Sequence, residues 1–144
     1  MGARTSGREA ALQMLFGIEA SGVSAEAAIY DYWRELPGEA EGRQYADALV
    51  QGVLSDLGAV DERISAASEH WRLDRMTRVD RNVLRIGTWE LVKMPSVPRA
   101  VILDEAVDLA KRYGAEDSGA FVNGVLDRIA NDAGREDAPE EPPR

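Results

Sequence analysis

Apolar residues recur at three- and four-residue intervals along almost the whole chain, and this spacing constrains the fold more than any other feature. In the clearest run, Ile102, Ala106, Leu109 and Tyr113 would share one face of a helix. Sustained two-residue alternation with β-branched residues, the pattern of a strand, is missing. The chain has no repeat of fixed period, which argues against a solenoid. The sequence therefore predicts an all-α protein with six to seven helices.

Capping residues and helix breakers indicate where these helices begin and end. The first is expected to follow a capping box, Ser6–Glu9, and to stop at Gly22. Asp61 is expected to cap a short helix, and Asp117 or Ser118 the last one. After the first helix, further helices are expected at about residues 24–35, 39–57, 61–68, 76–94, 102–113 and 118–134.

Length and charge predict one folded domain with a different segment at each end. The chain has 144 residues, of which 44% are hydrophobic, and this fits a single globular domain over residues 1–131. Residues 132–144 hold five acids, two arginines and three prolines, a net charge of −3, and are expected to form a disordered acidic tail. Residues 1–8 carry Arg4 and Arg8 without an acid, so we expect a basic arm there.

The overall charge of −9 argues against a protein that coats nucleic acid non-specifically. The charge is nevertheless unevenly distributed. The segment from Trp71 to Arg85 has five arginines against two acids, a net of +3, whereas acids are concentrated between Glu19 and Glu69. The sequence therefore predicts a polarised surface with local basic sites.

Several classes of chemistry have no support in the sequence. There is no cysteine and only one histidine, His70, so no metal site is expected. No glycine-rich phosphate loop is present, and adjacent carboxylates such as Asp104 and Glu105 have no nucleophile or histidine beside them. We expect no enzyme, no cofactor, no membrane-spanning segment and no secretory signal, hence a cytoplasmic protein.

Three segments carry a more specific pattern. They are Arg8-Glu9-Ala10-Ala11-Leu12-Gln13 with Phe16, Val83-Leu84-Arg85-Ile86-Gly87-Thr88-Trp89-Glu90-Leu91, and a C-terminal part that closes with Phe121-Val122-Asn123-Gly124-Val125-Leu126-Asp127. Together these segments resemble the NusB family of bacterial transcription antitermination factors. The resemblance covers about residues 4–131, and the segment between about 21 and 58 does not contribute to it.

The resemblance implies an all-α fold of two three-helix subdomains. It also implies pairing with NusE, a ribosomal small-subunit protein, and joint binding of the single-stranded boxA element of nascent ribosomal RNA. Such a pair acts on the RNA polymerase elongation complex indirectly, promotes readthrough of termination signals and supports ribosomal RNA synthesis. No catalysis is implied.

The resemblance assigns two sets of site residues. The RNA-side set consists of Arg4, Thr5, Arg8, Gln13, Asp117, Ser118, Phe121 and Asn123. The partner-side set, expected to face NusE, consists of Phe16, Glu19, Asp80, Asn82 and Arg85. Cationic side chains can bind phosphates and aromatic rings can stack on bases. Together these two contacts are enough to bind single-stranded RNA.

Alternatives stay open for several of these residues. Phe121 fits a core position as well as a stacking platform, and Asp117 fits an N-cap as well as a charge that restrains RNA affinity. Arg85 fits an ordinary salt bridge within the fold. The whole protein also fits a helical interaction module whose RNA contact comes from its partner, or a homodimer formed through exposed apolar residues such as Trp89.

Overall fold

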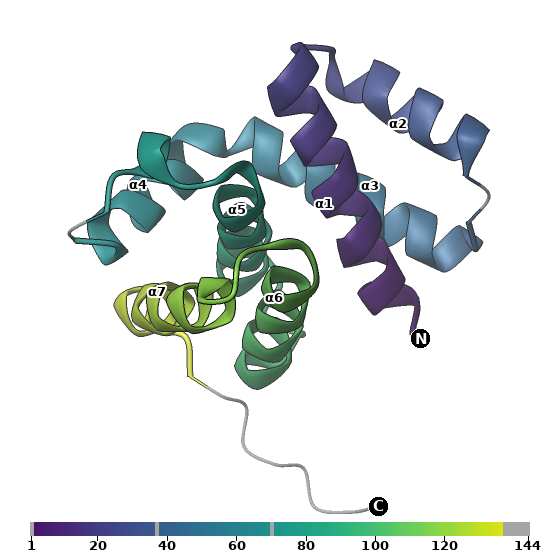
Figure 1. Cartoon of the computed structure of the whole chain (residues 1–144). Coiled ribbons are helices and arrows are strands. Elements are labelled where there is room, and N and C mark those ends of the chain that lie inside the picture. Colours follow the sequence, from purple (N-terminus) through teal and green to yellow (C-terminus); the bar gives the residue numbers. More distant parts are fainter. Residues whose placement is uncertain (1, 37, 70, 137–144) are drawn as a thin grey trace, which may run out of the picture.

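The structure is a computed structural model that describes residues 2–36, 38–69 and 71–136 (Figure 1). All regular elements in these residues are helical, which confirms the predicted class. They are α1 (Ala3–Ser21), α2 (Ala25–Glu35), α3 (Ala40–Ser55), α4 (Leu57–Ala67), the short 3₁₀ turn η1 (Leu73–Arg75), α5 (Arg78–Lys93), α6 (Arg99–Tyr113) and α7 (Ser118–Asp132).

Helix α5 is the centre of the molecule and joins two helical groups. It contacts α1, α3, α4, α6 and α7. Figure 1 shows α1, α2 and α3 grouped on one side of α5, and α6 and α7 on the other. Helix α5 accordingly buries residues around most of its circumference, as expected for an element enclosed by neighbours. The two helical groups that the resemblance implied are present.

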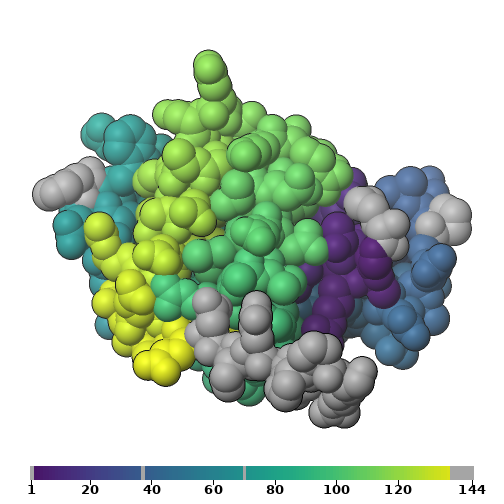
Figure 2. All heavy atoms as spheres, turned by 90° about the horizontal axis from the view of Figure 1, so that it is seen from below, coloured from purple at the N-terminus to yellow at the C-terminus, as the bar shows by residue number. Residues whose placement is uncertain are grey.

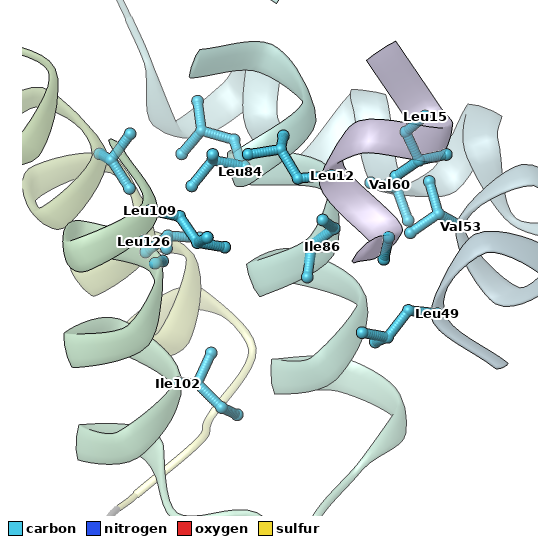
Figure 3. Close-up of a cluster of buried hydrophobic side chains, with 14 of the residues drawn as sticks. Leu12, Leu15, Leu49, Val53, Val60, Leu84, Ile86, Ile102, Leu109 and Leu126 are labelled. Carbon is cyan, nitrogen blue, oxygen red and sulfur yellow. The ribbon is translucent and has the colours of Figure 1, made fainter. Parts of the chain in front are cut away.

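The core is continuous across both groups. Figure 3 shows buried aliphatic side chains of α1, α3 and α4, such as Leu15, Leu49 and Val60, on one side of α5. On the other side of α5, Ile102 and Leu126 belong to the same buried cluster. Of the helix face predicted from its spacing, Ile102, Ala106 and Leu109 belong to this cluster, whereas Tyr113 at the end of the helix is 40% exposed.

Two close approaches between helices depend on glycine. A Cβ added at Gly7 of α1 would meet the carbonyl oxygen of Gly42 of α3 at 2.9 Å, so the two helices cross with their backbones nearly in contact. The Trp89 ring lies so close to Gly52 that an added Cβ would meet it at 2.2 Å. Trp89 Nε1 also donates to Asp56 Oδ2 at 3.1 Å. The description of Trp89 as an exposed apolar residue is therefore wrong.

Several predicted helix ends are confirmed. Helix α1 stops at Gly22, whose φ of 74° is left-handed, and the Gly22 N–H bonds the Ile18 carbonyl. Helix α2 starts at Ser24, whose hydroxyl accepts from the Ala27 N–H at 3.1 Å. Helix α6 ends before Gly114, as its apolar spacing predicted.

Two predicted caps are wrong, and residues in both places contact side chains that are distant in the sequence. Helix α1 begins at Ala3, so Ser6 lies inside it and forms no capping box. Thr5 in this first turn donates to Glu105 of α6, a contact 100 residues away in sequence. Asp61 lies within α4 and not at its start, and its carboxylate pairs with Arg85.

The described chain continues in ordered form beyond α7. Arg135 Nη1 donates to the carbonyl oxygen of Leu91 at 2.8 Å, and Arg135 also bonds the carbonyls of Pro95 and Val97. The predicted tail therefore does not begin at residue 132, and the rest of it, residues 137–144, lies outside the described residues. No helix in the described part of the chain is long and apolar enough to cross a bilayer.

Candidate functional site

A buried ion pair joins α1 to α5 beneath the predicted RNA side. Arg8 Nε and Nη2 donate to the two carboxylate oxygens of Glu90, each at 2.8 Å. Only 2% of Arg8 and 1% of Glu90 are exposed. Tyr45 of α3 donates its hydroxyl to Glu90, and Glu105 of α6 lies 3.2 Å from Arg8 Nη1. We call Arg8, Tyr45, Glu90 and Glu105 the Arg8 cluster.

Within the Arg8 cluster, one guanidinium pairs with the carboxylates of both Glu90 and Glu105. Burial, together with the neighbouring Glu90 carboxylate, raises the pKa of Tyr45, so this ring stays a neutral donor. The bidentate Arg8–Glu90 geometry is the strongest arrangement for such a pair. The prediction that Arg8 belongs to a basic arm is wrong, because its guanidinium is enclosed by three other helices and cannot reach a phosphate.

The other RNA-side residues of α1 lie nearer the surface. Arg4 is exposed, with its guanidinium carbon 5.6 Å from the centre of the Tyr45 ring. Thr5 is half-buried by its contact with Glu105. Gln13 is exposed and accepts from the Tyr32 hydroxyl at 3.1 Å. Arg4 and Gln13 are therefore accessible to a ligand, and their role in RNA binding stays a prediction.

The RNA-side residues of α7 differ in exposure. Asp117 stands at the N-cap position and is exposed, but its side chain makes no capping bond. Ser118 is buried, and its hydroxyl accepts from the Ala115 N–H at 2.9 Å, which fixes the turn before α7. Phe121 is half-buried against the core, and Asn123 is exposed. Ser118 thus shapes the turn, whereas Asp117 and Asn123 face solvent.

The end of α6 connects the two halves of the RNA-side set. Glu9 of α1 accepts from the hydroxyl of Tyr113 and from Arg112 Nη1 at 3.3 Å. The hydrogen bond to Glu9 raises the pKa of Tyr113. Figure 2 shows α1, α6 and α7 following one another across a single face of the molecule.

A second ion-pair cluster joins the other end of α1 to α5. Glu19 of α1 accepts from Arg81 and from Arg85 Nη1, the latter at 2.8 Å. Arg85 Nε and Nη2 bond both carboxylate oxygens of Asp61, at 2.8 and 2.9 Å. We call Glu19, Asp61, Arg81 and Arg85 the Glu19 cluster. Burial favours protonation of Glu19, but Arg81 and Arg85 outweigh it and lower its pKa.

The partner-side set converges on the Glu19 cluster. The Asn82 side-chain nitrogen lies 3.3 Å from Glu19 and donates to the Arg78 carbonyl at 2.8 Å. Phe16 is 41% exposed, with the Arg78 guanidinium 5.8 Å from its ring centre. Asp80 lies in the first turn of α5, directly before Arg81 of the Glu19 cluster. The salt-bridge interpretation of Arg85 is confirmed. Asn82 is only 1% exposed, so it is enclosed by the fold and does not face a partner directly.

Sequence comparison identifies the family. A sequence model of the NusB family matches residues 5–131. The transcription antitermination protein NusB of Sorangium cellulosum is 69% identical over 137 residues, which cover 95% of this chain and 98% of the relative. The chain belongs to the NusB family. The NusB protein of Myxococcus xanthus is also similar, at 45% identity over 134 residues, or 90% of this chain and 96% of the relative.

Solved structures of NusB proteins share the fold. NusB of T. maritima superimposes with a TM-score of 0.83 at 38% identity, over 91% of this chain and 92% of that one. A crystal structure of the antitermination factors NusB and NusE in complex with double-stranded RNA contains a chain with a TM-score of 0.83 at 28% identity. That match covers 92% of this chain and 98% of the other.

Sequence reasoning missed the residues that complete both clusters in this NusB-family chain. Glu90 was part of the resembling run, and an acid among buried positions of a helix was the available signal. Arg81 was visible within the basic segment of residues 71–85, but its partner on α1 was not. Tyr45 and Asp61 lie in or next to the segment without family resemblance, where the sequence offered no signal for their contacts.

Proposed function

We propose that this NusB-family chain acts in transcription antitermination by binding boxA RNA together with a NusE protein. The antitermination role follows from its family and its relatives, which are named transcription antitermination proteins. The role needs no catalysis, and we propose that the chain is not an enzyme. The observation that carries the proposal is that α1 presents exposed residues of both sets: Arg4 and Gln13 on the RNA side, and Phe16, which neighbours Arg78, on the partner side.

The RNA side of this proposal rests on accessible polar and aromatic groups. Arg4 and Gln13 are exposed on α1, and Asn123 is exposed on α7. Tyr113 lies between these helices with its ring 40% exposed. A cation, amides and rings along one face are the groups that hold unpaired nucleotides. With Arg8 enclosed, Arg4 is the RNA-side cation that remains accessible, so we propose weak RNA binding by the chain alone.

The partner side offers an apolar hollow beside charged groups. A pocket of about 200 Å³ next to Glu19 is lined by residues including Ile18, Leu54, Leu57 and Asn82. Phe16 projects nearby, and the Glu19 cluster presents both signs of charge at the rim. An apolar anchor surrounded by paired charges is the usual composition of a protein interface. We propose that NusE places an apolar side chain here.

Titration of a fluorescent boxA RNA with the chain, with and without NusE, tests the proposal. We expect weak binding by the chain alone and tighter binding when NusE is present. Asp80→Lys should weaken the association with NusE in the absence of RNA, because it reverses a charge at the partner side. Arg34→Lys is a suitable control, since Arg34 is exposed on α2, away from both sets. Equal RNA binding with and without NusE would contradict the proposal.

A second candidate function is an interaction module whose RNA contact comes entirely from the partner. The enclosure of Arg8 favours it, because one of the two cations expected to contact phosphate is unavailable. Arg4→Ala separates the two candidates. Weaker binding of the RNA by the variant with NusE present supports direct contact by this chain, and unchanged binding supports the second candidate.

A further inference from the structure

A groove lies between the end of α4 and α7. Of its lining residues, only Phe121 belongs to either predicted set of site residues. The groove has a volume of about 420 Å³, within the range of about 300–1,000 Å³ typical of small-molecule sites. Trp71 and Phe121 form its aromatic walls, Gly124 of α7 opens onto it, and Arg128 lies at its rim. The groove continues past Trp71 into a second hollow lined by Arg72.

Trp71 is held in place although its side chain is exposed. It is 55% exposed, an unusual position for so large a ring. Its backbone N–H donates to the Ser68 carbonyl at 2.8 Å, and the Ser68 hydroxyl donates to the Trp71 carbonyl at 2.9 Å. Arg128 of α7 also donates to the Ala67 carbonyl at the end of α4, at 2.7 Å. The indole is therefore presented by an anchored backbone.

Gly124 keeps the groove open. Glycine inside a helix lowers helix stability relative to alanine, so a glycine in α7 calls for a packing or functional reason. No neighbour in the described fold gives a packing reason, because a Cβ at Gly124 would meet nothing within 4 Å. Space that the protein itself leaves unfilled, beside two aromatic rings, is available to a flat ligand.

We propose that the Trp71–Phe121 groove binds one unpaired base of the RNA, extending the RNA side beyond the turn between α6 and α7. This inference rests on the proposed function. Phe121 belongs to the RNA-side set and lines the groove, so the two surfaces are continuous. Base stacking on exposed rings is tolerant of sequence and works beside arginine. Arg128 and Arg72 provide cations near the flanking phosphates, each close to an acid, Glu69 and Asp74.

Binding of boxA RNA in the presence of NusE, measured for groove variants, tests the inference. Trp71→Ala should weaken binding by roughly 5- to 100-fold, which is the loss expected for one stacked base. Trp71→Phe keeps a ring and should restore most of the affinity. Gly124→Leu should also weaken binding, because its side chain fills the groove. Gly58→Leu is the matched control, since Gly58 also has open space around it but lies away from the groove on α4.

An RNA series in which each base in turn is removed identifies the contact. At one position, loss of the base should weaken binding to the unmodified protein but not weaken binding to Trp71→Ala any further. Wild-type RNA affinity in Trp71→Ala and Gly124→Leu would overturn the groove assignment alone. Loss of NusE association by Trp71→Ala without RNA would also overturn it, since the groove would then hold protein. No RNA binding by the unmodified chain with NusE would overturn the proposed function as well.

Discussion

The Arg8 cluster and the Glu19 cluster use the same residue types at the two ends of the α1–α5 contact, with the polarity reversed. In the first, the arginine is on α1 and the acid on α5; in the second, the acid is on α1 and the arginines are on α5. The central Arg8–Glu90 pair is sealed, with side chains 2% and 1% exposed, whereas in the Arg85–Glu19 pair the two side chains are 13% and 22% exposed. The difference teaches that burial, and not residue type, separates a structural ion pair from one available to a partner.

The largest expected effect is the loss of stability on breaking the sealed pair. Arg8→Met leaves Glu90 as an uncompensated buried charge and should lower the free energy of unfolding by about 3–5 kcal/mol. Urea unfolding followed by circular dichroism measures this change. Arg8→Met combined with Glu90→Leu removes both charges and should recover much of the loss. If the Arg8→Met variant were as stable as the unmodified protein, the Arg8–Glu90 pair would not be a buried structural pair, and the proposed difference between the two clusters would be wrong.

Breaking the open cluster should cost less stability. Arg85→Met should lower the free energy of unfolding by about 1–2 kcal/mol, because Asp61 and Glu19 both reach solvent once their partner is gone. The same variant should bind NusE more weakly, which the Arg8 and Glu90 double variant should not. Titration calorimetry with NusE compares the two, and equal loss of NusE binding in both would contradict the assignment of the partner side.

A smaller effect is expected in the pH dependence of stability. Arg81 and Arg85 lower the pKa of folded Glu19 below its unfolded value of about 4.3. Its contribution is therefore present above about pH 4.3 and is lost as the pH falls through the folded pKa. Glu19→Gln should be less stable than the unmodified protein near neutral pH, and the gap should shrink in acid. Urea unfolding at several pH values checks this, and a gap independent of pH would exclude ionised Glu19 as its source.

The smallest effect is expected at Arg4, one helical turn from Arg8. Arg4→Ala should change the free energy of unfolding by less than about 0.5 kcal/mol, because the guanidinium is exposed. It should also reduce the slope of log affinity for boxA RNA against log salt by about 0.7, the value for one phosphate contact on a single strand. Anisotropy titrations at several salt concentrations measure this slope, and an unchanged slope would place Arg4 outside the RNA contact.

The sequence predicted the helices better than it predicted the environment of the charged residues. Apolar spacing identified the buried faces, and Gly22 and Ser24 mark helix ends because their effect is local. Arg4 and Arg8 look equivalent in the sequence. In the fold, however, Arg8 is buried and pairs with Glu90, which lies 82 residues later in the chain. Asp61 was mistaken for a cap for the same reason, since its partner Arg85 comes 24 residues later. Contacts of this range depend on how helices pack, which periodicity does not report.

For the candidate site, the family resemblance brought together residues that the fold also brings together on the partner side. Glu19, Asn82 and Arg85 are in mutual contact. Exposure was harder to predict on both sides, because Arg8 and Ser118 of the RNA-side set and Asn82 of the partner-side set are enclosed. Trp71 was visible within the basic segment, but its exposure and its position opposite Phe121 follow only from the fold.

The most direct test of the division between the two clusters is an NMR titration that follows arginine Nε–Hε resonances while NusE is added. We expect the resonances of Arg81 and Arg85 to shift with the NusE concentration, and that of Arg8 to stay in place because Glu90 and two neighbouring helices enclose it. A shift at Arg8 with none at Arg81 and Arg85 would contradict the account.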